Sequence, residues 1–170
     1  YASAPPALTY MADEQLTGVQ AAVHINDYYF PIIKTAGDPI RLNGYQTEPA
    51  FLEMFNFPLI SGSKEALTQP GLVIITQKTA KKLFGEEPAM GKSIDTENWG
   101  KLQVGGVLAP FPKRTHFKFD LLTGIAPNHG LNESNDANWT GFQSNFYYLR
   151  SELKPAQLEA QFNTMARAGK

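Results

Sequence analysis

Residues 72–85 read Leu-Val-Ile-Ile-Thr-Gln-Lys-Thr-Ala-Lys-Lys-Leu-Phe-Gly, and this stretch carries the clearest local indication of the fold. Its first four residues are all apolar and predict a short buried strand. Thr76 then stands where a helix N-cap is expected, and Gly85 stands just beyond the last residue of the predicted helix, Phe84. A strand that leads directly into a capped helix indicates a domain that contains both kinds of element.

Other elements are predicted on both sides of this stretch. Strands are expected at residues 19–25, 28–33, 57–62 and 102–107 and around 142–148, and helices at 3–18, at 49–55 and from 155 onward. These strands and helices do not alternate in a strict βαβα order. The sequence therefore predicts an α+β fold with a mixed sheet and helices.

Turn and loop signals separate these elements. Asn43-Gly44 lies between two strand-like runs and predicts a two-residue hairpin turn, because both residues tolerate positive φ angles. Pro31 indicates that the aromatic strand lies at a sheet edge or is interrupted there. Residues 63–71 are polar and end in Pro-Gly, which predicts a loop. Gly105-Gly106 predicts a β-bulge or a close backbone approach.

The bulk composition argues against several classes of function. The 170 residues fit one ordinary domain, and 42% of them are apolar, which suffices for a sizeable core. The formal net charge is −1, so we expect no nucleic-acid partner. The absence of cysteine excludes disulfides and thiolate chemistry. No run approaches the roughly 20 apolar residues of a membrane span, and the start at Tyr1 is typical of a segment excised from a longer protein.

The three histidines are the first candidates for catalysis, and none belongs to a specific catalytic motif. His24 lies in an apolar strand and is interpreted as structural. His116 precedes Asp120 by four residues, and such a pair could orient an imidazole as a general base. No nucleophile motif of the G-x-S-x-G kind is present, however, and His129 lies in a polar loop. We therefore expect no catalytic residue and no enzymatic activity.

Metal and cofactor sites are not predicted either. Glu133 and Asp136 could form a loose cation loop, but the calcium-loop pattern is missing. Residues 85–93 resemble the end of a phosphate-binding loop, yet Glu86 stands where the first glycine is required, and the helix precedes the glycines. Asn138-Trp139-Thr140 is a formal glycosylation acceptor that has meaning only in a eukaryotic secretory route. We expect no cofactor and no metal.

Two aromatic segments are candidates for binding. Lys113-Arg114 lies among phenylalanines and could contact single-stranded nucleic acid, but two cations are too few, and the phenylalanines are interpreted as core. The run that contains Tyr28, Tyr29 and Phe30 either is buried on both faces of a strand or forms an exposed apolar patch for a partner or an oily substrate. These three aromatic residues are the candidate partner surface.

An ordered series of short motifs resembles a known family. Residues 51–62 have the pattern F-x-x-x-F-x-F-x-L-x-x-G, residues 73–85 contain the strand, cap and helix described above, and a Gly-Lys turn follows at 91–92. Residues 104–108 and the His-Phe-Lys-Phe-Asp segment at 116–120 complete the series. In this order, over residues 47–122, the motifs resemble the MacB-like periplasmic core domain of bacterial ABC-transporter permeases, a group that includes FtsX- and LolC-type permeases.

The resemblance implies one extracytoplasmic domain over residues 1–170 with two subdomains. Both chain ends, residues 1–27 and 142–170, would form a porter-like part, and residues 28–141 would form an inserted central part. The two ends would emerge on the same side of the fold, because transmembrane helices of the same chain would adjoin both of them. The domain would then lie on the periplasmic side of the inner (cytoplasmic) membrane.

The resemblance also implies a non-catalytic function in mechanotransmission. The domain would couple ATP-driven movement to the handling of a substrate or partner in the periplasm, as in export or in the release of lipoproteins or peptides. The implied partners are a second permease subunit, a cytoplasmic ATPase subunit or domain, and a periplasmic partner protein. Two alternatives stay open: a regulatory interaction module that controls a cell-wall hydrolase or a sensor kinase, and a free-standing periplasmic binding protein or enzyme.

Overall fold

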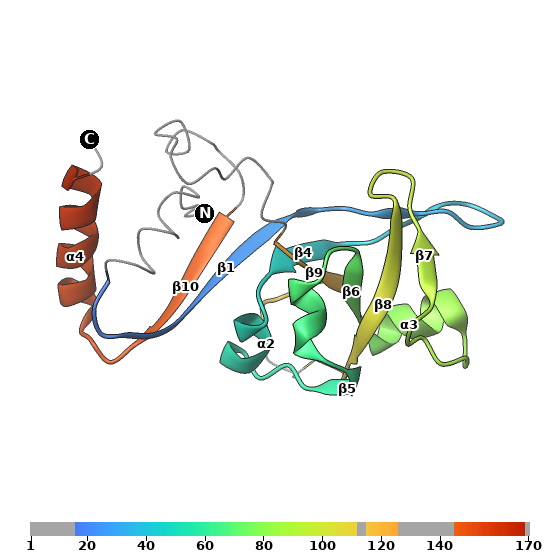
Figure 1. Cartoon of the computed structure of the whole chain (residues 1–170), viewed down its shortest axis with the longest axis horizontal. Helices are drawn as coiled ribbons and strands as arrows, with labels where there is room; N and C mark the ends of the chain where they lie inside the picture. Colours follow the sequence, from blue (N-terminus) through green and yellow to red (C-terminus); the bar gives the residue numbers. More distant parts are fainter. Residues whose placement is uncertain (1–15, 112–114, 126–144, 169–170) are drawn as a thin grey trace.

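The computed structural model describes residues 16–111, 115–125 and 145–168, whose arrangement is shown in Figure 1. The larger sheet has the strand order β10-β1-β4-β9-β6-β8-β5, with β7 paired to β8. Its strands are β1 (Val19–Tyr29), β4 (Gly44–Thr47), β5 (Leu59–Gly62), β6 (Leu72–Thr76), β7 (Ser93–Asp95), β8 (Lys101–Leu108), β9 (Leu121–Gly124) and β10 (Asn145–Ser151). The pairs β4–β9 and β6–β8 are parallel, whereas β1, β5 and β7 pair antiparallel with their neighbours. This mixed sheet confirms the predicted α+β fold.

The remaining elements are short except for the last helix. They are β2 (Ile32–Ile33), β3 (Ile40–Arg41), α2 (Ala50–Met54), the 3-10 helix η1 (Lys64–Thr68), α3 (Gln77–Phe84) and α4 (Pro155–Ala168). The helices predicted near residues 49–55, after Thr76 and from Pro155 are thus confirmed. The helix predicted at residues 3–18 falls almost entirely outside the described residues, as does the start of the last predicted strand.

One strand, β1, connects two regions of the molecule. Its residues from Val19 to Asn26 pair with β10, and its residues from Ile25 to Tyr29 pair with β4. In Figure 1 the helix α4, β10 and the start of β1 lie apart from the compact body that contains β4, β6, β8 and β9. We call residues 16–22, β10 and α4 the terminal unit, and the rest of the described chain the central body.

The hairpin predicted at Asn43-Gly44 is wrong. β2 pairs antiparallel with β3, with Ile33 opposite Ile40, so the chain reverses at residues 34–39. The chain then continues into β4, where Gly44 lies opposite Tyr29 of β1. A Cβ atom on Gly44 would meet the Tyr29 ring at 2.4 Å. The glycine is therefore required by the close approach of this ring to the backbone, and not by a turn.

Two other local predictions concerned interruptions of strands, and both are confirmed. Pro31 lies between the end of β1 and the start of β2. Successive residues of β6 pair with Val104 and then with Gly106, which leaves Gly105 as the extra residue of a bulge in β8. At this bulge β8 lies close to residues 64–68, since a Cβ on Gly105 would meet the Ala66 side chain at 2.7 Å.

The loop predicted at residues 63–71 is wrong over half its length, because Lys64–Thr68 form η1. The side chain of Ser63 caps this helix by accepting a hydrogen bond from the Glu65 N–H group. Ala66 and Leu67 are buried beneath the turn. The polar residues that suggested a loop form the outward side of this short helix. Its buried side consists of only two residues, Ala66 and Leu67.

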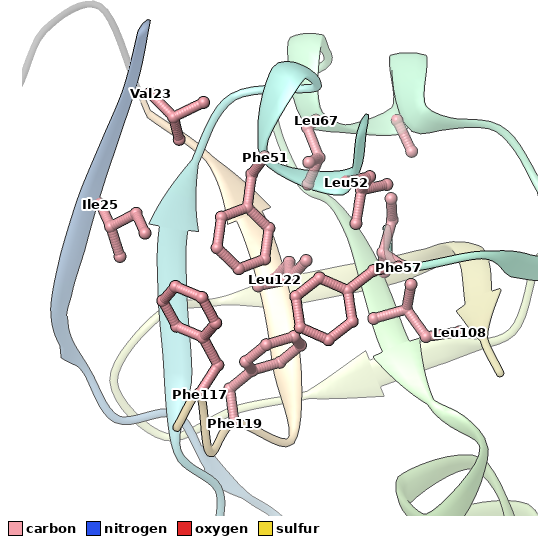
Figure 2. Close-up of a cluster of buried hydrophobic side chains, with 12 residues drawn as sticks. Val23, Ile25, Phe51, Leu52, Phe57, Leu67, Leu108, Phe117, Phe119 and Leu122 are labelled. Carbon is pink, nitrogen blue, oxygen red and sulfur yellow. The ribbon is translucent and has the colours of Figure 1, made fainter. Parts of the chain in front are cut away.

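The sheet is buried on both faces, because successive side chains of β6 point to opposite sides. Ile74 lies in one cluster with α2, whereas Val73 and Ile75 lie in another with the apolar side chains of α3. The first cluster, shown in Figure 2, is rich in aromatic rings, and we call its members Phe51, Phe57, Phe117 and Phe119 the phenylalanine cluster. Burial on both faces explains why residues 72–75 are uniformly apolar.

The start of α3 has the N-cap that the sequence predicts. The Thr76 hydroxyl oxygen accepts a hydrogen bond from the Thr79 N–H group at 3.1 Å and lies 2.8 Å from the Thr79 hydroxyl. The helix ends at Gly85, where φ is +63°. Both ends of α3 are thus determined by the residues that flank it directly, Thr76 and Gly85.

We expect Thr76→Ala to lower the free energy of unfolding by about 0.5–2 kcal/mol, because it leaves a backbone N–H group of the first turn without its acceptor. Urea denaturation of both proteins measures the difference. Thr76→Ser retains the hydroxyl and should retain most of the stability. A serine variant that loses as much as the alanine variant would show that the threonine methyl group, and not the cap, is what stabilises the helix.

Candidate functional site

A cavity of about 660 Å³ lies at one end of the larger sheet. β6 and β8 are parallel to each other, and β9 is parallel to β4 but antiparallel to β6. The carboxyl ends of β6 and β8 therefore meet the amino ends of β4 and β9 at this end of the sheet. Segments that follow or precede these strands line the cavity, together with the first turns of α3.

The backbones of these segments are joined by hydrogen bonds. The Asn43 N–H group donates to the Asp120 carboxylate at 2.9 Å, and the Asp120 N–H group donates to the Asn43 carbonyl at 2.6 Å. The Asp120 carbonyl in turn accepts from the Thr76 N–H group at 3.0 Å. Asn43 and Asp120, which line the cavity, are therefore bonded to each other and to the end of β6.

Part of the cavity wall is apolar. Ala109, Pro110 and Phe111 follow β8, and Phe119 precedes β9. The rings of Phe111 and Phe119 contact each other, with centroids 4.7 Å apart. Because Phe119 belongs to the phenylalanine cluster, the apolar wall continues directly into the core.

The charged side chains of the wall are mostly cationic. Lys78 and Lys81 come from α3, and Lys118 comes from the segment before β9. Lys81 lies 3.9 Å from Glu86, and both of these side chains are largely exposed. Within the described ranges, Lys78 and Lys118 have no carboxylate within 4.0 Å. The sequence did not predict this cavity, because its lining residues come from segments that are far apart in the chain.

The candidate partner surface is only partly accessible. Tyr28 is 71% exposed, and the ring of Phe30 packs edge-on against it with centroids 5.3 Å apart. Tyr29 is only 2% exposed and packs against Trp99. Burial also raises the pKa of Tyr29 from its ordinary value of 10.0 to about 12, because the charged phenolate would lose its hydration. A role in partner binding stays a prediction, and only Tyr28 and Phe30 have side chains that reach solvent.

The histidines lie in two different environments. His24 is buried, and its N–H and carbonyl groups bond to the side chains of Glu48 and Thr47, respectively. The His116 ring is exposed and lies against Phe117, with centroids 4.1 Å apart. His129, the acidic pair Glu133 and Asp136, the Asn138-Trp139-Thr140 sequence and the basic pair Lys113-Arg114 lie outside the described residues. Among the residues that are described, no three His, Asp or Glu side chains converge as metal ligands.

The first and last segments of the described chain lie side by side in the terminal unit. The Thr17 N–H group donates to the Gln161 side chain at 2.9 Å, and the Gln161 amide donates back to the Thr17 carbonyl at 3.3 Å. The Ser151 hydroxyl donates to the Gly18 carbonyl at 2.7 Å. These contacts place residues 17–18 beside Ser151 and Gln161; that both ends of the domain emerge on one side stays a prediction. No helix in the described ranges is both long enough and apolar enough to span a bilayer.

A family model described as the MacB-like periplasmic core domain matches residues 2–165 of the chain. The chain belongs to this family. It is therefore the periplasmic domain of a MacB-like ABC-transporter permease, and the resemblance carried by residues 47–122 is confirmed. No sequence among curated proteins matches the chain significantly.

Solved structures of similar domains have the same fold. A domain of a putative permease from Porphyromonas gingivalis superposes with a TM-score of 0.82 at 23% identity, covering 100% of this chain and 73% of that one. The periplasmic region of MacB from Actinobacillus actinomycetemcomitans gives a TM-score of 0.68 at 11% identity and covers 98% and 74%. The extracellular domain of the noncanonic ABC-type transporter YknZ from Gram-positive bacteria gives 0.60 at 15% identity and covers 91% and 75%.

Proposed function

We propose that this MacB-like domain is a non-catalytic lever that carries ATP-driven movement from the membrane part of its permease to the periplasm. The observation that supports this most directly is that β1 belongs to both the terminal unit and the central body. Movement applied to the chain ends would first displace the terminal unit. A continuous strand would then pass that displacement to the central body without a flexible linker.

The joint between the two regions is well packed on the side of the central body. Val23 and Ile25 of β1 are fully buried and belong to the same cluster as Phe51 (Figure 2). The buried Thr47 hydroxyl donates to the His24 carbonyl at 2.8 Å. Because a buried hydrogen bond and two core side chains hold β1 in place, the joint should resist bending.

The division into a porter-like part (residues 1–27 and 142–170) and a central part (residues 28–141) is retained as part of this proposal. Its boundary at residue 27 falls inside β1, beside the irregular pairing between Asn26 and Tyr29. The two parts would therefore move together, with a local irregularity where they meet.

The partners in this proposal are those of a permease. Transmembrane helices of the same chain would adjoin both ends of the domain in the inner membrane, and a second permease subunit would face it. A cytoplasmic ATPase subunit or domain would supply the movement. The exposed Tyr28 and the half-buried Phe30 remain the proposed contact for a periplasmic partner protein.

We expect ATP to change the distance between the central body and the bilayer in the full-length permease assembled with its ATPase. The measurement is resonance energy transfer from a dye on Glu97→Cys, in the central body, to acceptor lipids. A dye on Glu159→Cys, on the exposed side of α4, reports the terminal unit. The 170 residues contain no natural cysteine, so the introduced thiol is the only one in the domain, and cysteines elsewhere in the permease and its ATPase are replaced before labelling.

Insertion of Gly-Gly between Ala22 and Val23, where the terminal unit meets the central body in β1, should uncouple the two regions. Two added residues preserve which face of the strand each side chain occupies, while the glycines add backbone freedom at the joint. The ATP-dependent signal should then persist at Glu159→Cys and disappear at Glu97→Cys. If ATP moves the label at residue 159 but not the one at 97 in the uninserted protein, the lever proposal is wrong.

A further inference from the structure

We propose that the cavity at the end of the sheet binds a small amphipathic anion, with one carboxylate or phosphate group and one short apolar chain. Its volume of about 660 Å³ falls within the range of roughly 300–1,000 Å³ that is usual for small-molecule sites. The binding site is independent of the lever and would exist even if the domain moved in another way.

The apolar half of the ligand is indicated by the wall that follows β8. Ala109, Pro110 and Phe111 present apolar surface to the cavity, and Phe119 closes the wall toward the core. The methylene stems of the lysines add further apolar surface. An apolar chain in this space would displace water from a surface that cannot hydrogen-bond to it.

The anionic half is indicated by the charges around the cavity. Lys78 lies on α3, and Lys118 lies on the segment before β9, so the two ammonium groups reach the cavity from different elements. With Lys81 they outnumber the one carboxylate of the lining, Asp120, which accepts a hydrogen bond from Asn43. The whole chain carries a net charge of −1. This local excess of cations is therefore a property of the cavity and not of the protein in general.

The same charges disfavour other ligand classes. Three ammonium groups repel a metal cation. The glycine-rich phosphate loop that many nucleotide sites place between a strand and a following helix is absent here, because β6 ends at Thr76 and α3 begins at Gln77. A molecule with one anionic group at one end of an apolar chain matches both kinds of surface.

The probe is octanoate, titrated into the isotope-labelled 170-residue chain and followed by amide NMR shifts. We expect saturable shifts at residues 78, 109 and 118. Acetate has the anionic group without the chain, and octyltrimethylammonium has the chain with the opposite charge. Both should bind at least about tenfold more weakly than octanoate, because each loses one of the two contributions. A short apolar peptide, with a free or an amidated carboxyl end, distinguishes a peptide terminus from a fatty acid as the natural source of this chemistry.

The variant Lys78→Ala/Lys118→Ala should weaken octanoate binding by about tenfold, as expected for the loss of charge-assisted contacts at exposed positions. Lys82→Ala is the matched control, since Lys82 is an exposed lysine on α3 that does not line the cavity. Ala109→Phe should place a ring in the space that the apolar chain would occupy and should also weaken octanoate binding. The proposal is overturned if octanoate causes no shifts at the cavity, if octyltrimethylammonium binds equally well, or if the double variant and Lys82→Ala behave alike.

Discussion

Phe51→Ala is expected to lower the free energy of unfolding by about 3–5 kcal/mol, as is usual for removal of a buried aromatic ring. The Phe51 side chain is 0% exposed. Its ring stacks on Phe57 with centroids 5.3 Å apart and an interplanar angle of 12°, and it meets Phe117 edge-on at 5.1 Å. Removal of the ring would leave a cavity in the middle of the phenylalanine cluster that the neighbouring rings cannot fill (Figure 2).

The comparison that tests this is Phe55→Ala, measured by the same urea or guanidinium denaturation. Phe55 contacts Phe51 but is only partly buried, so its truncation should cost clearly less. Phe51→Leu is a milder change that should keep the domain folded if the alanine variant does not fold. Equal losses for the alanine variants of Phe51 and Phe55 would show that Phe51 is not the centre of the cluster.

Phe51 also links stability to the proposed function. Val23 and Ile25 of β1 share its cluster, so the ring supports the joint between the terminal unit and the central body. A weakened cluster should loosen that joint before the whole domain unfolds, because local opening requires less free energy than global unfolding.

Gly62→Ala is expected to lower the free energy of unfolding by about 2–5 kcal/mol, because two unfavourable effects act together. The backbone of Gly62 has φ of +83°, which costs an L-residue with a side chain about 1–2 kcal/mol. An added Cβ would also lie 2.2 Å from the Gly105 carbonyl oxygen and 2.5 Å from the Gly106 Cα. These are backbone atoms of β8 and cannot rotate away, so β5 would have to separate from the bulge in β8.

Gly71→Ala separates these two effects. Gly71 has a nearly equal φ of +79°, but an added Cβ would meet nothing within 4 Å. Replacement of Gly71 should therefore lower the free energy of unfolding by only about 1–2 kcal/mol, the contribution of the positive φ alone. Chemical denaturation of both variants measures the difference. If Gly62→Ala loses no more stability than Gly71→Ala, the close approach of β5 to β8 contributes nothing, and the prediction is wrong.

Local patterns predicted the elements whose determinants lie close together in the sequence. The strand at residues 72–75, the Thr76 cap and the end of α3 at Gly85 are all confirmed, because burial, capping and a positive φ act over one or two turns of chain. The bulge at Gly105 was also predicted, since glycine weakens a regular strand and is typical of positions where the strand bends or another backbone comes close.

Sequence-based prediction was wrong where the same local pattern can arise for two different physical reasons. Asn43-Gly44 has the composition of a turn, but Gly44 is small because the ring of Tyr29 lies on its backbone. That ring is contributed by a residue 15 positions earlier, and only the β1–β4 pairing brings it there. The run Tyr28-Tyr29-Phe30 is divided by a distant residue in the same way: Trp99 packs on the Tyr29 ring, whereas Tyr28 is 71% exposed. Its role as a partner surface stays a prediction.

Residue patterns alone were enough to establish the α+β class, the capped strand-to-helix unit at residues 72–85 and the membership of the MacB-like family, because each depends on residues that are neighbours or occur in a fixed order. Two features emerged only from the folded arrangement: β1 is shared by two regions, and Lys78 and Lys118 line one cavity with Phe111. Both depend on which distant strands pair and in which register. Pairing is decided by burial over the whole sheet, which no short stretch of sequence contains.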